Sequence, residues 1–279
     1  MVEYILAEVS VKSRSASIMP SSIDQSLLES GDPAPVELLR PQGQSVFVLT
    51  ADHAGRAIPR RLGSLGLSAG DLEKHIAWDI GVGEVARLLS AALDAPLVLQ
   101  AYSRLVIDCN RDPAVESSIA AVSEHTRIPA NENVTRADAV LRRRNIFDPY
   151  HAAIAGLLNE RKAAAMPSIM IALHSMTPVF KGQSRAMHSA VLYDQDGRFA
   201  HCVLRALREE SGLIVAENQP YFVSPATDYT IPHHAEGRLP YAEIEIRQDL
   251  IAGQTGQREW SERLARVLRS AQQDFSGTV

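Results

Sequence analysis

The sequence predicts an α/β fold with three layers, in which helices cover both faces of a mixed, largely parallel central sheet. Two observations support this class. Apolar runs such as 45–50 and 168–173 lack polar alternation, which is typical of strands buried on both faces. Strand and helix patterns also follow one another repeatedly along the chain, and this order predicts a parallel sheet flanked by helices.

The first predicted strand covers residues 45–50, a short apolar run rich in β-forming residues. Apolar residues at helical spacing within 82–93 predict a long helix, which begins after Asp79 and ends before Pro96. The next two strand candidates are 97–99 and 105–107.

The second half of the chain continues the same alternation. Residues 112–135 are polar and irregular, and a loop of this length inside a domain is usually functional or mobile. Residues 214–240 are also irregular. The remaining predicted strands are 168–173, 190–193 and 241–246, and the helices are 147–165, 198–211 and 259–273.

The chain divides into two parts. Residues 1–40 are rich in serine and proline and predict a weakly structured N-terminal extension, in which 2–11 could add an edge strand. Residues 41–279 predict a single catalytic α/β domain, which is a plausible size for one core.

Composition excludes several classes of partner. The net charge of −5 and the pI near 6.0 argue against a nucleic acid or an anionic membrane surface. No apolar run approaches the ~18 residues that span a bilayer, and the N-terminus lacks a secretory signal pattern. Two cysteines, Cys109 and Cys202, are too few for a disulfide framework and indicate a reducing cytoplasm.

Two histidines stand where predicted buried strands end, His53 after the first strand and His174 after 168–173. The carboxyl ends of parallel strands meet at one edge of a sheet, where ligands bind. Catalytic zinc sites commonly combine two histidines with one carboxylate. Together the two residues predict a metal site, whereas either one alone is more typical of a histidine that only forms hydrogen bonds.

The third metal ligand has more than one candidate. Asp79 is the first choice, although an aspartate at the start of a helix is also a common cap. His75 is a competing ligand and is otherwise an ordinary surface histidine. The adjacent histidines at 233–234 lie in a predicted loop and could line the entrance of a site.

Glu243 and Glu245 lie on one face of the alternating strand 241–246, because side chains repeat every two residues. A carboxylate in such an apolar run is costly unless it is paired or functional. Near a metal-bound water, Glu245 could take a proton and pass it to the leaving amine. The alternative is a solvated edge strand with two exposed glutamates.

Arg104 and Arg111 flank a short segment that contains Asp108 and Asn110. Guanidinium groups bind carboxylates through paired hydrogen bonds, so these arginines suit an acidic substrate. The alternative is structural, with Asp108 holding either arginine in an ion pair, and both roles are compatible. Three further arginines could contribute, namely Arg56, Arg185 and Arg247.

Together these motifs resemble the N-formylglutamate amidohydrolase family, from about Val46 to Leu250. The segment Ser103-Arg104-Leu105-Val106-Ile107-Asp108-Cys109-Asn110-Arg111 is the most specific part of the resemblance. The other matching segments are Asp52-His53-Ala54-Gly55, Ile58-Pro59, Asp79, Leu173-His174-Ser175 and Ile244-Glu245.

The family is similar in turn to zinc carboxypeptidases and aminoacylases, which implies a zinc-exopeptidase-like fold. The motifs shared with those enzymes fall here on His53, Asn110-Arg111, His174-Ser175 and Glu245 followed by Arg247. Carboxypeptidases also have a glutamate ligand three residues after the first histidine, where this chain has Arg56. The third ligand is therefore carried over to Asp79.

The resemblance implies a metal-dependent amidohydrolase that cleaves the amide of an N-formyl or N-acyl acidic amino acid. In the namesake case N-formylglutamate gives formate and glutamate in histidine degradation. The implied site holds one divalent metal, expected to be zinc, on His53, Asp79 and His174, with Glu245 as the catalytic residue. The implied substrate-binding residues are Arg104, Asn110, Arg111, Arg185 and Arg247.

Other functions are compatible with the same residues. One is a deacylase, an aminoacylase or a small peptidase for another N-acyl amino acid. Another is a non-catalytic binder of an acidic metabolite, an alternative that the Arg56 departure keeps open. A homo-oligomer is compatible with each function.

Overall fold

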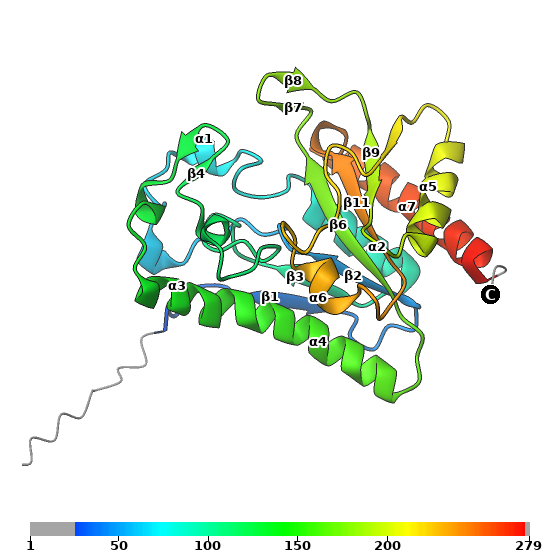
Figure 1. The fold of residues 1–279 in the computed structure, drawn as a ribbon, viewed down its shortest axis with the longest axis horizontal. Helices are drawn as coiled ribbons and strands as arrows, with labels where there is room; N and C mark the ends of the chain where they lie inside the picture. Colours follow the sequence, from blue (N-terminus) through cyan, green and yellow to red (C-terminus); the bar gives the residue numbers. More distant parts are fainter. Residues whose placement is uncertain (1–25, 277–279) are drawn as a thin grey trace, which may run out of the picture.

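The computed structural model describes residues 26–276. Within this range a seven-stranded sheet forms the centre of the molecule, in the order β1-β3-β2-β6-β11-β9-β10 (Figure 1). Its strands are β1 (Val36–Leu39), β2 (Phe47–Ala51), β3 (Leu97–Gln100), β6 (Ile169–Met176), β9 (Ser189–Leu192), β10 (Val215–Glu217) and β11 (Tyr241–Arg247). The pairs β2–β3, β2–β6, β6–β11 and β9–β10 are parallel, and β1–β3 and β9–β11 are antiparallel. The predicted mixed, largely parallel sheet is confirmed.

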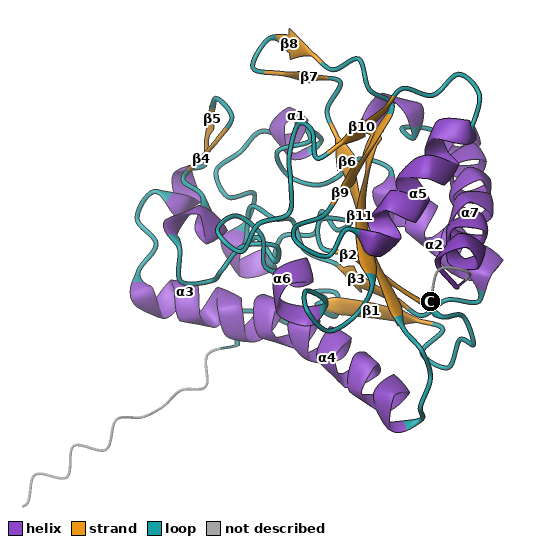
Figure 2. Ribbon diagram, turned by 45° about the vertical axis from the view of Figure 1, so that its right-hand side comes forward, coloured by secondary structure: helices purple, strands orange, loops and turns teal. Residues whose placement is uncertain are grey.

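Helices cover both faces of the sheet, which confirms the three layers (Figure 2). One face carries α2 (Val82–Leu93), α5 (Arg198–Glu209) and α7 (Gln254–Ser276), which share an apolar core with the strands. The apolar positions of α2 that predicted a helix lie on its buried side, which explains why this segment is helical and where it packs.

The opposite face carries α4 (Asp148–Ala163), which continues from α3 (Arg136–Arg142) through a π-helical turn at Arg143–Phe147. Two short helices, α1 (Ala69–Leu72) and α6 (Thr230–His234), lie on the same side among long loops. Those loops also hold two hairpins, β4 (Val122–Ser123) with β5 (Thr126–Arg127) and β7 (Val179–Phe180) with β8 (Gln183–Ser184). The loops build the walls of the site described below.

The prediction of a strand at 105–107 is wrong, because this segment forms a turn. Its side chains are nevertheless buried in the core beneath α4, so the apolar pattern reflected burial. Side chains satisfy its backbone: Asn131 donates to the carbonyl of Leu105 at 2.8 Å, and Arg142 donates to that of Val106 at 3.0 Å. The segment can therefore be buried without a partner strand.

The sheet begins earlier than the predicted domain boundary near residue 41. Strand β1 lies within the stretch expected to be a weakly structured extension, and it pairs antiparallel with β3 at the edge of the sheet. Leu27 is buried in the core as well. The edge strand suggested at 2–11 lies outside the described residues. Between residues 26 and 276, no helix is both long and apolar enough to cross a membrane.

Candidate active site

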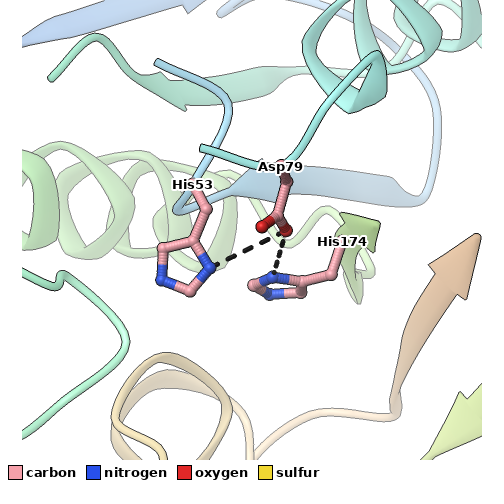
Figure 3. Close-up of side chains that lie close together, drawn as sticks. All are labelled: His53, Asp79 and His174. Carbon is pink, nitrogen blue, oxygen red and sulfur yellow. Dashed lines mark hydrogen bonds and ion pairs between the residues drawn. The ribbon is translucent and has the colours of Figure 1, made fainter. Parts of the chain in front are cut away.

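The three predicted metal ligands meet at one edge of the sheet (Figure 3). His53 follows β2, Asp79 precedes α2, and His174 lies inside β6 rather than after it. One ligand atom from each residue lies within 4.8 Å of the other two, and the two imidazole centroids are 5.0 Å apart. The backbone N–H of Asp79 donates to the carbonyl of His53 at 2.8 Å, which joins two of the segments directly.

Asp79 faces both imidazoles. Its Oδ2 lies 3.1 Å from Nδ1 of His174 and 3.7 Å from Nδ1 of His53. The N-cap of α2 is Gly81, so the alternative role of Asp79 as a helix cap is wrong. The alternative prediction that His75 is the third ligand is also wrong. Its Nε2 lies 3.2 Å from Glu124, and the residue lies outside the group formed by His53, Asp79 and His174.

A second carboxylate lies behind each histidine. Nε2 of His53 is 2.8 Å from Asp108, and Nε2 of His174 is 3.5 Å from Asp52. Such outer carboxylates orient the ring and make the inner nitrogen a better ligand. Asp52 belongs to the predicted motif at 52–55, but no role was predicted for it. Its position before a strand-end histidine was the only signal, and its partner is far away in the chain.

The electrostatics of the cluster fit a cation. Burial alone would raise the pKa of Asp79, but His174 and His53 hold that pKa well below its usual range. Burial opposes a charge on His174, yet Glu243, Asp52 and Asp79 raise its pKa well above the ordinary value. Nδ1 of His53 is buried and has no hydrogen-bond partner within residues 26–276. These groups match the donor set of a divalent metal that displaces protons on binding.

The cluster opens into a cavity of about 270 Å³. Residues from three further parts of the chain complete its lining, namely Arg104, Asn110 and Arg111, the segment 220–222 with Thr227 and Asp228, and Glu243 and Glu245. A larger hollow of about 920 Å³ lies beside the start of α2, but none of the metal ligands lines it. The smaller cavity is the candidate site because His53, Asp79 and His174 line it.

Glu243 and Glu245 are buried in the middle of the sheet. Strand β11 lies between β6 and β9, so the alternative of an exposed edge strand is wrong. The two residues are only 5% and 7% exposed. Glu245 is in register with His174 on the neighbouring strand. Burial raises the pKa of Glu245 to about 7 and that of Glu243 to about 8.

The arginines of the cavity divide into two kinds. Arg104 binds Oδ2 of Asp108 through Nε at 3.0 Å and Nη2 at 2.7 Å, which is the structural role considered for it. Within the described chain, Arg111 has no side-chain hydrogen bond and no ion pair, so its guanidinium is available to a ligand. Asn110 is held in place, because its Oδ1 accepts from the N–H groups of Tyr229 and Thr230.

Other residues that were predicted to contribute lie outside the lining of this cavity. Arg185 is buried next to it and donates to the hydroxyl of Tyr221 at 2.6 Å. Arg247 pairs with Asp249 at 2.8 Å and braces the backbone of 185–187. The histidines at 233–234 line a different cavity of about 660 Å³.

The family can now be assigned. A family model described as FGase, N-formylglutamate amidohydrolase, matches residues 45–252. The chain belongs to the N-formylglutamate amidohydrolase family. It is therefore a hydrolase that acts on amide bonds, as the motifs at His53, His174 and Glu245 led us to expect. Among curated proteins, no sequence matches the chain.

The solved structures that are similar to this fold include the following two. One is a gene product of Agrobacterium tumefaciens, with 34% identity, a TM-score of 0.86, and coverage of 90% of this chain and 99% of its own. The other is N-formylglutamate amidohydrolase from Ralstonia eutropha, with 21% identity, a TM-score of 0.64, and coverage of 88% and 100%. At 21% identity, the second comparison shows only that the two proteins share a fold.

Proposed function

We propose that the protein is a metal-dependent amidohydrolase that cleaves the amide bond of an N-formyl or other N-acyl amino acid. The observation that carries the proposal is the convergence of His53, Asp79 and His174 beside Glu245 in one cavity. N-formylglutamate, which would give formate and glutamate, is the reference substrate because it is the namesake of the family. The proposed compartment is a reducing cytoplasm, which agrees with two buried free cysteines.

His53, Asp79 and His174 would hold one divalent cation, for which zinc is the first candidate. Such a cation supplies Lewis acidity, which polarises a carbonyl and lowers the pKa of a water to ~7. Asp108 and Asp52 would orient the two imidazoles from outside.

Glu245 would act as the general base and acid. Its carboxylate has a buried Oε2 without a partner in the described chain, and it is next to His174 across the β6–β11 pairing. A raised pKa of about 7 suits a group that first accepts a proton from water and then donates it to the leaving nitrogen. Arg111 would bind the α-carboxylate of the substrate, and the absence of a side-chain hydrogen bond or ion pair to it among residues 26–276 supports this role.

The test is formate release from N-formylglutamate and other N-formyl amino acids, with and without a chelator. We expect turnover that the chelator removes and that added zinc restores. A stoichiometric metal content in the purified protein is expected as well. Formate release that is unaffected after the metal has been fully removed would contradict the metal-dependent mechanism.

A further inference from the structure

A second cavity lies apart from the candidate active site. Its volume is about 660 Å³, and it lies between the C-terminal part of α4 and the segment 233–239 at the end of α6. No residue of its lining also lines the cavity of the candidate metal site. Residues 166–168 and 238–239 of its lining precede β6 and β11, whereas His174 and Glu245 lie toward the other ends of these strands. The two cavities therefore lie at opposite ends of the same strands.

The lining of this second cavity combines an apolar wall with positive charge. Lys162 lies on α4, Arg238 lies on the loop after α6, and no carboxylate lines the cavity among residues 26–276. The apolar wall comprises Ala155, Leu158, Ala165, Met166, Pro167 and Leu239. A cavity of this size, with a mostly apolar lining and a few polar groups, is typical of a small-molecule site.

The two cations of the lining have no acidic partner within the described chain. Lys162 forms no side-chain hydrogen bond there, and Arg238 donates from Nη1 to the carbonyl of His233, which leaves its other N–H groups available. The carboxylate of Glu236, in the same loop, lies outside the lining and accepts a hydrogen bond from the hydroxyl of Tyr241. A lysine near the end of α4 also suits the helix dipole, but the dipole does not account for Arg238 on another segment. Uncompensated positive charge therefore lies beside the apolar wall.

The histidines of the lining fix its shape and add no charge at neutral pH. His234 is 6% exposed, and its Nε2 lies 3.0 Å from Nδ1 of His151 on α4. Burial lowers the pKa of His234 to about 3 and also lowers the pKa of His233. Because the hydrogen bond between the two rings joins α6 to α4, this side of the cavity is formed before a ligand binds. The positive charge comes from Lys162 and Arg238 alone.

We propose that this cavity is a second ligand site, which binds a small carboxylate with an apolar chain. Lys162 and Arg238 would bind the carboxylate, since ammonium and guanidinium groups form charge-assisted hydrogen bonds with it. The apolar wall would cover the chain and remove its surface from water. The site does not depend on the proposed amidohydrolase activity, because it shares no lining residue with the candidate active site.

Isothermal titration calorimetry with octanoate tests the proposal, and each part of this probe has a matched control. Octanamide keeps the chain without the charge, octylamine reverses the charge, and acetate keeps the carboxylate without the chain. We expect one octanoate per protein chain, bound at least about ten-fold more tightly than each of the other three, since hydrogen bonds to charged groups are the stronger ones. Absence of octanoate binding would overturn the proposal, and so would octanamide or acetate that binds as tightly as octanoate.

Substitutions locate the bound octanoate. Lys162→Gln and Arg238→Gln should each weaken its binding by about ten-fold, because each removes a charged donor. Lys74→Gln replaces an exposed lysine outside the lining, so this matched control should leave the affinity unchanged. Arg111→Gln should leave it unchanged as well. A loss of affinity confined to R111Q would place octanoate in the active-site cavity and overturn the proposal.

A variant that changes volume and not charge completes the test. Ala155→Phe should weaken octanoate binding, because a larger side chain occupies part of the cavity that Ala155 lines. The melting temperature of each variant shows whether it folds, and any two of the three cavity variants suffice to decide. Unchanged affinity in the folded variants would overturn the proposal. A protein that binds octanoate in this way but releases no formate would contradict the proposed function alone.

Discussion

Asp52 lies directly before one proposed metal ligand, His53, in the sequence and contacts the other proposed histidine ligand, His174. Its Oδ2 faces Nε2 of His174, and its Oδ1 accepts hydrogen bonds from the hydroxyls of Tyr150 at 2.6 Å and Thr230 at 2.9 Å. These donors come from α4 and α6. A single buried carboxylate therefore connects His174 to two helices, α4 and α6.

Replacing this carboxylate should weaken metal binding. We expect Asp52→Asn to lower the zinc affinity by about 10–100-fold, because an outer carboxylate makes the imidazole a better ligand. Tyr150→Phe removes one donor to Asp52 and should have a smaller effect in the same direction. Competition with a fluorescent chelator measures both. Unchanged zinc affinity in D52N would show that the contact is only structural.

Glu245 should matter for chemistry and much less for binding. We expect Glu245→Gln to reduce kcat by about 10²–10⁴-fold, since the amide cannot carry the proton from water to the leaving nitrogen. Metal content and KM should change little. Formate release and metal analysis on the same preparation provide the measurement. Near-normal turnover in E245Q would remove Glu245 from the role of base.

At the scale of elements, the turn into α2 positions Asp79. Gly81 is the N-cap of this helix and has a φ of 82°, and a Cβ at this position would lie 2.1 Å from the backbone oxygen of Ile251. Only glycine fits so close an approach with a left-handed backbone. This turn leads the chain from Asp79, a proposed metal ligand, into the helix within two residues.

Gly81→Ala should therefore destabilise the protein. We expect a loss of about 1–3 kcal/mol from the strained backbone, with a further cost from the contact with Ile251. Zinc affinity should fall as well, because Asp79 lies in the same turn. Gly156→Ala is the matched control, since this exposed position in α4 has open space and should gain about 0.5–1 kcal/mol. Urea unfolding measures the free energy of unfolding of both variants. Equal stability of G81A and the parent would refute the argument.

At the scale of the whole molecule, a pair of buried histidines joins α4 to α6. Nε2 of His151 donates to the carbonyl of Cys109 at 2.8 Å, so its Nδ1 accepts from Nε2 of His234 at 3.0 Å. Both rings are neutral in this arrangement. Burial lowers the pKa of His151 to about 4 and that of His234 to about 3, from an ordinary value of 6.5.

This pair should make the fold sensitive to acid. Below pH 6.5 the unfolded chain binds protons that the folded pair does not, so the free energy of unfolding should decrease as the pH falls from 6.5 toward 4. The loss is expected to be on the order of a few kcal/mol. His234→Gln should flatten this dependence, whereas His201→Gln, at an exposed position on α5, should not. Urea unfolding at pH 7 and pH 5 measures the difference, and parallel behaviour of H234Q and the parent would contradict the assignment.

The local pattern of apolar residues predicted many of the strands and helices correctly. The apolar runs at 169–173 and 241–246 lie in β6 and β11, and the helical spacing within 82–93 is that of α2. The strand predicted at 105–107 failed because an apolar pattern reports burial, and side chains of Asn131 and Arg142 replaced the partner strand. The role of Asp52 was missed because it depends on residues about a hundred positions away.

The amino-acid sequence by itself determined the fold class, the two histidines of the candidate metal site, and the family. These follow from side-chain periodicity and from chemistry that local segments carry. Only the tertiary structure decided that Asp79 and not His75 joins the two histidines, that Glu243 and Glu245 are buried in the middle of the sheet, and which arginine has no ion pair among residues 26–276. The physical reason is that pairing and solvation depend on neighbours brought together by the sheet, and no local pattern encodes those distances.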